Sequence, residues 1–96
     1  MFVHILEFPP IMPGKDAEFR DWFASTNAQF AGYPGLVSRK LLVEQDSSNY
    51  VAVVEHESIE AFKSMQASDE HAAAGARLKP LLDGKPSRRA FDVVVG

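Results

Sequence analysis

The sequence predicts one α+β domain, residues 1–96, whose elements follow the order βαββαβ. Three features indicate this class. Four segments are rich in alternating apolar or β-branched residues, which is typical of strands. Two segments carry apolar residues at every third or fourth position, which is typical of amphipathic helices. The chain has 96 residues, 46% of them hydrophobic, and this supports one modest core but not two.

The first strand is predicted over residues 2–8, where inward and outward side chains alternate until the Pro-Pro pair at 9–10 ends the run. A helix is predicted after Gly14, because acidic residues favour its N-terminus and Gly32 stops it. One face of this helix carries a row of mostly aromatic residues at helical spacing, namely Phe19, Trp22, Phe23, Thr26 and Phe30.

A β-hairpin is predicted for residues 36–44 and 50–57, two apolar and β-branched runs joined by a polar loop of turn-forming residues. A loop that contains glycine, proline and serine follows the second predicted helical segment, and a last strand is predicted for residues 90–95.

The second helix is predicted to begin at Ser58, whose hydroxyl can cap it, with Phe62 and Met65 at three-residue spacing on one face. Ser68 offers a second cap and is followed by two acidic residues. We therefore expect a kink or break near Ser68, followed by an alanine-rich helix that runs toward Pro80.

With right-handed crossovers, this order gives a four-stranded antiparallel sheet with both helices on one face. The strands are nevertheless apolar on both faces, as residues 50–54 and 90–95 show. A second face left in water would be an unusually large apolar patch. We therefore expect a homodimer that pairs through the sheet face. A different protein covering that face is the alternative.

Composition and charge exclude several classes of function. The chain has no cysteine, which excludes disulfides, thiolate metal sites, Fe–S ligation and cysteine nucleophiles. The N-terminus lacks a signal-peptide pattern and a long apolar run, so we expect a cytoplasmic protein with no membrane partner. The net charge is −3, and the pair Arg88-Arg89 is interpreted as a solvated turn, so no nucleic-acid partner is expected.

Five short pieces of sequence follow one another along nearly the whole chain. They are Glu7-Phe8-Pro9 leading to Pro13-Gly14-Lys15, then Glu18-Phe19, Pro34-Gly35-Leu36, Glu57-Ser58-Ile59-Glu60-Ala61-Phe62 and Ser68-Asp69-Glu70-His71. In this order and spacing the chain resembles the antibiotic-biosynthesis monooxygenase family and is similar to its quinol-monooxygenase-like members. The resemblance implies a ferredoxin-like subunit, paired into a dimeric α+β barrel, with a ligand pocket between sheet and helices. Members of the family differ in activity, so the fold alone does not fix the function.

His71 is the predicted catalytic base, because an imidazole titrates near about 6.5 and can take a proton at neutral pH. The resemblance implies the same role, since His71 matches the histidine of the family's Ser-x-x-His element. Helical spacing places it on one face with Gly75, Leu78 and Leu82, beside several alanines that leave room for a cavity. The alternative is a histidine at a helix start that bonds a neighbouring carboxylate or faces water.

Six further residues are candidates for substrate binding: Trp22, Tyr50, Arg39, Met65, His4 and His56. Trp22 and Tyr50 could form the walls of a pocket for a flat aromatic ligand. Arg39, which alternates with Val37 and Leu41 on a strand, could stabilise a developing oxyanion. Its alternative role is a salt bridge at the rim of the sheet.

His4 and His56 are expected to lie close together, because the first and third strands should be antiparallel neighbours. With Glu55 or Glu57 they would make a crude set of metal ligands. A metal site needs defined geometry, however, and we predict none. The simpler interpretation is that His56 caps a strand end and His4 hydrogen-bonds within the sheet.

The leading prediction for function is a cofactor-independent monooxygenase that uses O₂ to oxidise a small quinol-like or polyphenolic aromatic, with His71 as base. Haem degradation is disfavoured, because the family branch with that activity has Asn, Trp and His where this chain has His4, Met65 and a position near Ala74. A non-catalytic module for small-ligand binding or self-assembly explains the same residues. An isomerase would need only a base and an acid, such as His71 and Glu7.

Overall fold

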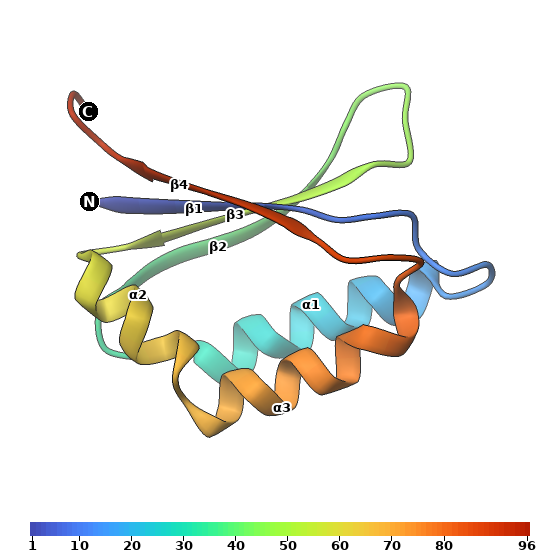
Figure 1. Cartoon of the computed structure of the whole chain (residues 1–96), viewed down its shortest axis with the longest axis horizontal. Coiled ribbons are helices and arrows are strands. Elements are labelled where there is room, and N and C mark those ends of the chain that lie inside the picture. Colours follow the sequence, from blue (N-terminus) through green and yellow to red (C-terminus); the bar gives the residue numbers. More distant parts are fainter.

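Four antiparallel strands and three α-helices form two layers in the computed structural model, which describes residues 1–96 (Figure 1). In chain order these are β1 (Phe2–Glu7), α1 (Asp16–Phe30), β2 (Leu36–Val43), β3 (Tyr50–His56), α2 (Ile59–Gln66), α3 (Asp69–Leu78), a 3₁₀ turn (Lys79–Leu81) and β4 (Ser87–Asp92). The order predicted from the sequence is confirmed, with the second helical segment divided into α2 and α3. None of the helices has the length and apolar character needed to cross a membrane.

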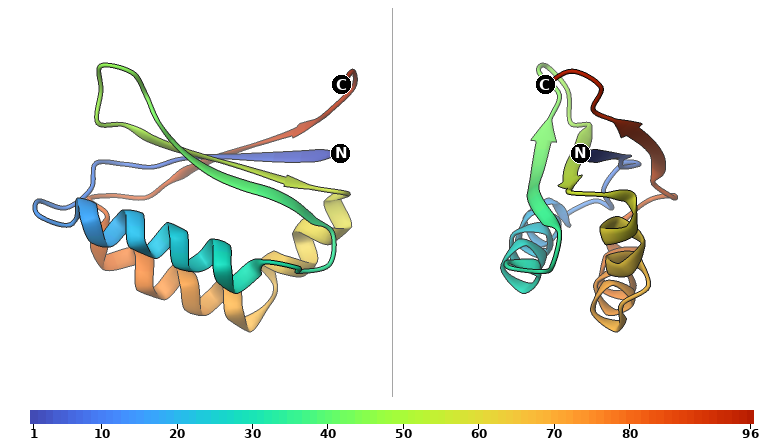
Figure 2. Two further views of the ribbon diagram at one scale, coloured as in Figure 1. Left: turned by 180° about the vertical axis from the view of Figure 1, so that it is seen from behind. Right: turned by 90° about the vertical axis from the view of Figure 1, so that its left-hand side faces the viewer.

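The sheet has the strand order β2-β3-β1-β4, so β1 and β3 are central and β2 and β4 are edge strands. All three pairings are antiparallel, and His4 of β1 lies opposite Val54 of β3 and Ala90 of β4. Both views in Figure 2 show α1 and α3 side by side along one face of the sheet. The short helix α2 lies at the end of the sheet near the N-terminus. The predicted ferredoxin-like α+β arrangement is therefore confirmed.

Two serine caps produce the division between α2 and α3. The Oγ of Ser58 accepts the N–H of Ala61 at 3.1 Å, and the Oγ of Ser68 accepts the N–H of His71 at 3.1 Å. Ser68 itself has extended backbone angles, so one helix ends before it and a new helix begins after it. The predicted break near Ser68 is confirmed, and it fixes His71 in the first turn of α3.

The core between the two layers is built mainly by α1. Phe19, Phe23, Thr26 and Phe30 are buried, as their helical spacing predicts. The ring of Phe19 is completely buried and packs against the ring of Phe8 at a centroid distance of 5.0 Å. These contacts hold α1 against the central strands.

The last strand, β4, starts at residue 87, earlier than the expected range of 90–95. Arg88 and Arg89 therefore belong to the sheet, so the predicted turn is wrong, whereas both residues are solvent-exposed as expected. Arg88 lies opposite Leu6 and shares its helix-facing side, whereas Nη2 of Arg89 donates to Glu7 at 2.6 Å. Pairing with β1 supplies the backbone hydrogen bonds of this polar stretch, which has no apolar period of its own.

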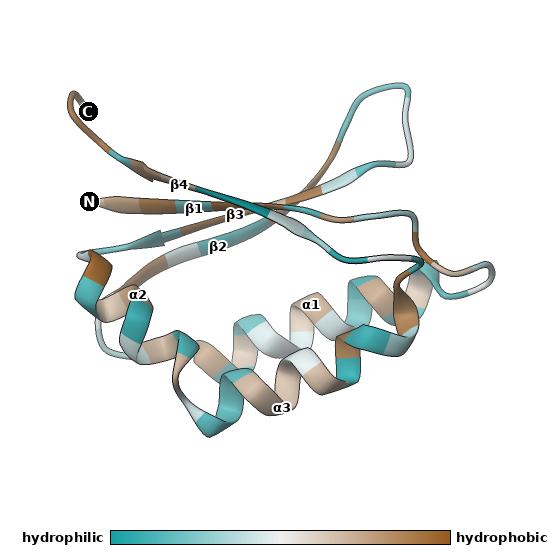
Figure 3. Cartoon of the chain, viewed as in Figure 1, coloured by the Kyte–Doolittle hydropathy of each residue, from teal (hydrophilic) through white to brown (hydrophobic).

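The face of the sheet that points away from the helices is uncovered in the single chain. Val37 and Phe91 are 46% and 44% exposed there. The middle of this face is formed by Val3, Ile5, Val51 and Val53, which are partly exposed. Figure 3 shows that the segment after β4 is also strongly hydrophobic. The expected apolar second face is therefore present.

Candidate functional site

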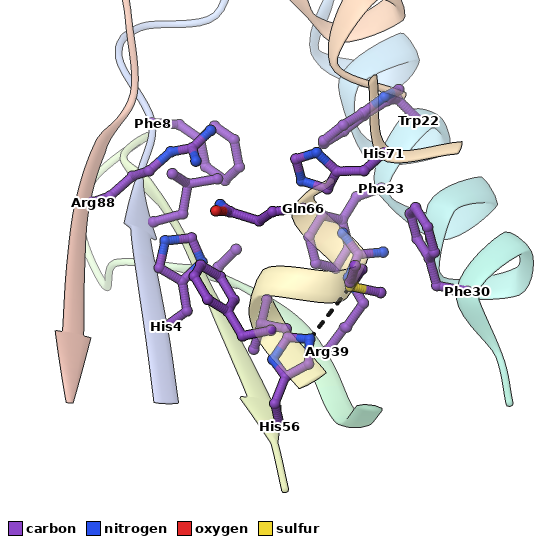
Figure 4. Close-up of a pocket in the computed structure, with 15 residues that line it drawn as sticks. His4, Phe8, Trp22, Phe23, Phe30, Arg39, His56, Gln66, His71 and Arg88 are labelled. Carbon is purple, nitrogen blue, oxygen red and sulfur yellow. Dashed lines mark hydrogen bonds between the residues drawn. The ribbon is translucent and has the colours of Figure 1, made fainter. Parts of the chain in front are cut away.

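A cavity lies between the helix-facing side of the sheet and the helices (Figure 4). Nine of its fifteen lining residues are hydrophobic, and five of these nine are aromatic. The polar ones are His4, Arg39, His56, Gln66, His71 and Arg88. The cavity has a volume of about 60 Å³, which is room for roughly four or five water molecules.

The polar lining contains three imidazoles, two guanidinium groups and one amide, and no carboxylate. All three histidines of the chain are therefore in this one cavity. Because the histidines have lowered pKa values, described below, the charge at neutral pH comes from the two arginines. The cavity is thus positive and lies between apolar walls, an environment that favours an anion.

The sheet contributes one of these basic groups from each strand. Across the strand order they are Arg39 on β2, His56 on β3, His4 on β1 and Arg88 on β4. Each of these side chains faces the helices. The two imidazoles lie on the central strands, and the two guanidinium groups lie on the edge strands. The positive charges therefore flank the floor of the cavity.

A β-bulge in β2 decides which cation enters the cavity. Leu36 lies opposite His56, but the register then shifts between Leu36 and Ser38. The extra residue, Val37, moves the following side chains to the other face, so Arg39 pairs opposite Val54 and points inward, while Lys40 is exposed. The expected alternation of Arg39 with Val37 is therefore wrong, because the bulge separates them.

Arg39 has no acidic partner. Its Nη1 donates to Oγ1 of Thr26 at 2.7 Å and to Oδ1 of Asn27 at 3.1 Å, and its Cζ lies 4.8 Å from the centroid of the Phe23 ring. No carboxylate lies within ion-pair distance, so the alternative of a rim salt bridge is wrong. Burial lowers the pKa of Arg39 to about 10, which leaves it charged at neutral pH.

His71 lines the cavity from the first turn of α3, and Figure 4 shows its ring directed into the cavity near Trp22. Its ring makes no hydrogen bond to the protein, and it lies 6.5 Å from the ring of Phe30. Burial lowers the pKa of His71 from 6.5, and the charges of Arg88 and Arg39 lower it further. The imidazole is therefore neutral at pH 7 and has a free nitrogen for a proton.

His4 and His56 are also buried in the cavity wall, on either side of Phe62. Their ring centroids lie 4.8 Å and 5.5 Å from that of Phe62. Burial lowers the pKa of His4 to about 4, with a further contribution from Arg88 and the other two histidines. The Nδ1 of His56 is buried without a partner, and its Nε2 lies 3.3 Å from the sulfur of Met65. The expectation that His4 hydrogen-bonds within the sheet through its side chain is wrong.

Comparison with known proteins identifies the family of the chain. Residues 1–77 match the family model of the antibiotic biosynthesis monooxygenases. The chain belongs to this family. Arg88 lies in the cavity but beyond the matched residues, so the family match does not include it. A search of curated protein sequences finds no match.

Three solved structures illustrate the similarity. SnoaB of Streptomyces nogalater, a cofactor-independent oxygenase, is 26% identical with a TM-score of 0.85, over 99% of this chain and 94% of SnoaB. A Caulobacter crescentus protein provisionally named as an antibiotic biosynthesis monooxygenase is also 26% identical, with a TM-score of 0.85 over 98% of this chain and 91% of its own. Rv0793 of Mycobacterium tuberculosis, at 17% identity, shares the fold with a TM-score of 0.86 over 99% and 96% of the two chains.

In this member of the family, Trp22 and Met65 line the cavity, as the sequence predicts. The Nε1 of Trp22 donates to the carbonyl of Ala74 at 2.9 Å, which ties α1 to α3 and fixes the indole plane. Met65 is buried against His56. Gln66 was missed by the sequence analysis. Its amide makes no hydrogen bond to the protein, and Figure 4 shows it extending into the middle of the cavity.

Tyr50 lies outside the cavity that His71 lines, and its role in substrate binding stays a prediction. It begins β3, at the opposite end of the strand from His56, and is buried against Phe19 at a centroid distance of 4.8 Å. Its hydroxyl donates to Asp16 and accepts from Nε of Arg20 at 2.7 Å. The polar handle that suggested a ligand contact is satisfied by α1 instead.

The residues of this chain do not form a set of metal ligands. No three histidine, aspartate or glutamate side chains come together. Glu55 lies opposite Val3 and so points to the other face from His4 and His56, because side chains alternate along a strand.

Proposed function

We propose that this chain is a cofactor-independent monooxygenase that oxidises a small quinol-like or polyphenolic aromatic with O₂. One observation carries the proposal: a neutral His71 with a free ring nitrogen opens into an aromatic-walled cavity that holds two guanidinium groups and no carboxylate. Family membership and the similarity to SnoaB, named a cofactor-independent oxygenase, support the reaction type and the absence of a cofactor.

The first step is the transfer of a phenolic proton to His71. Arg39, which is half-buried, and Arg88, which is exposed, favour the resulting phenolate, because nearby positive charge lowers the energy of an anion. An electron-rich phenolate can pass one electron to O₂, whereas the neutral phenol does so poorly. The protein therefore acts by creating and holding the anion, which its positive lining suits.

The remaining steps need no external reductant. The phenoxyl radical and superoxide combine at a ring carbon that carries hydrogen. The resulting peroxide anion takes the proton back from His71, and loss of water leaves one oxygen atom on that carbon. For a simple hydroquinone, the ring and O₂ yield a hydroxyquinone and one water, with all four electrons supplied by the ring. Apolar walls such as Phe23 and Phe62 suit both the aromatic ring and the apolar O₂ molecule.

Oxygen uptake with a panel of reduced quinones and anthrones tests the proposal, with autoxidation of each compound as the baseline. Wild type should exceed the baseline, His71→Ala should lose most of that excess, and Arg77→Gln, at an exposed position on α3 outside the cavity, should keep it. Mass spectrometry with ¹⁸O₂ should find one labelled oxygen in the product. If no member of the panel is accelerated, the proposed reaction is wrong. If His71→Ala is as fast as wild type, another group is the base.

We also infer that two copies pair through the uncovered sheet face, in the cytoplasm. The support is the exposed apolar side chains of that face, including Val37 and Phe91. Phe91→Asp should shift the protein to a monomer in light scattering at micromolar concentration, whereas Ile59→Asp, an exposed apolar residue on α2, should not. A monomeric wild type would contradict this inference.

A further inference from the structure

Arg39 is a cation that the protein itself leaves half satisfied. Only Nη1 hydrogen-bonds to protein atoms, those of Thr26 and Asn27, and both are neutral acceptors. The N–H groups of Nε and Nη2 have no protein acceptor, although they lie on a half-buried side chain that lines the cavity. His56 Nδ1 is the only buried side-chain polar atom without a partner, so these two N–H groups of Arg39 are open to the cavity and available to an anionic ligand.

The rings around Arg39 hold its guanidinium in one orientation. Its Cζ lies 4.8 Å from the Phe23 centroid and 5.4 Å from the Phe30 centroid, both on α1. With Nη1 fixed by α1 as well, the remaining edge of Nε and Nη2 is a preformed fork. Two parallel N–H groups of this kind match the two oxygens of a carboxylate.

We propose that the aromatic ligand carries a carboxylate, which binds to Nε and Nη2 of Arg39. This inference rests on the proposed function for the aromatic ring itself. Figure 4 shows Arg39 and Arg88 on opposite sides of the cavity with Gln66 between them. A carboxylate at Arg39 therefore leaves Arg88 and His71 for the phenolic end of the same ring. The favoured class is a dihydroxybenzoate-type acid rather than an unsubstituted quinol.

Binding under nitrogen tests this without any turnover. Calorimetry would compare 2,5-dihydroxybenzoate with 2,5-dihydroxybenzamide, which has the same ring and shape but no charge. We expect the carboxylate to bind at least about tenfold more tightly, the effect of a charge-assisted pair of hydrogen bonds. Trp22 is the only tryptophan, so a shift of its single indole N–H resonance reports occupation of the cavity.

Two substitutions assign the preference to Arg39. Arg39→Gln should reduce the ratio of the two affinities to within about twofold, and Arg77→Gln, at an exposed position on α3, should leave it unchanged. Arg39→Lys keeps the charge without the fork and should reduce the ratio at least about threefold, which provides the test if Arg39→Gln does not fold. A third ligand, 2,5-dihydroxybenzenesulfonate, separates a planar carboxylate from a general anion and should bind more weakly than the carboxylate.

Equal affinity of wild type for the acid and the amide would overturn the inference, as would an undiminished preference in Arg39→Gln. Sulfonate binding as tight as that of the carboxylate would overturn the assignment to a planar fork. These outcomes are distinct from those of the oxygen-uptake experiment. Oxidation of neutral quinols without a carboxylate preference refutes only this inference, and preferential binding without oxygen uptake refutes only the proposed reaction.

Discussion

Replacing His4 by Asn should remove part of the acid sensitivity of the fold. Burial, followed by the charge of Arg88 and of the other histidines, lowers the pKa of His4 from 6.5 to about 4. The unfolded chain keeps the ordinary value, so between pH 6.5 and pH 4 it binds a proton that the folded chain does not. The stability that depends on neutral His4 is complete above pH 6.5 and is lost as the pH falls toward 4.

The two pKa values of His4 set the size of the effect. Their full difference corresponds to about 3 kcal/mol. Because the cavity admits water, which screens the imidazolium charge, we expect about 2 kcal/mol. Wild type should thus lose about 2 kcal/mol more than His4→Asn between pH 7.5 and pH 4.

Urea unfolding followed by circular dichroism, at one protein concentration and several pH values, measures this difference. The loss of packing against Phe62 affects His4→Asn at every pH, so the comparison uses only the change with pH. No surface histidine adds an ordinary titration, since all three line the cavity. Parallel stability curves for the two proteins would refute the argument that His4 is held neutral by its surroundings.

Three further results are expected. Arg88→Gln should raise the pKa of His71 toward 6.5, because the charge of Arg88 helps to lower that pKa, whereas Arg89→Gln should leave it unchanged. NMR titration of the His71 imidazole measures the pKa, and equal shifts in the two variants would contradict this expectation. Ser68→Ala should cost about 1 kcal/mol in urea unfolding, since α3 loses its N-cap, and an unchanged midpoint would show that the cap is dispensable. Gly35→Ala should lower the free energy of unfolding by more than about 1 kcal/mol, because the φ of Gly35 is +81° and a Cβ there would meet α2. An unchanged melting temperature would refute this.

The features that could be predicted from the sequence are those with a local cause. The aromatic row of α1 has helical spacing, and the caps at Ser58 and Ser68 lie immediately before the helices that they begin. The facing of His4 and His56 into one space follows from alternation along two neighbouring strands. In each case the information lies within a few residues or in a simple pairing rule.

The features that could not be predicted depend on long-range pairing. Arg88 enters the cavity because β4 pairs with β1 in one particular register, and nothing near residue 88 encodes that register. The inward direction of Arg39 depends on a β-bulge that no residue type in β2 predicts. Tyr50 has the right chemistry for a pocket wall, but it lies at the far end of β3 and packs against Phe19 in the core.

The arrangement of basic residues across the sheet has a consequence for how such a cavity can change over generations. Central strands are hydrogen-bonded on both sides, so substitutions on β1 and β3 disturb two neighbours, whereas those on β2 and β4 disturb one. The guanidinium groups of Arg39 and Arg88 both come from these edge strands. Ligand charge preference is thereby separated from the part of the sheet that specifies the fold, and a descendant sequence could accept neutral or differently charged rings by changing two edge positions.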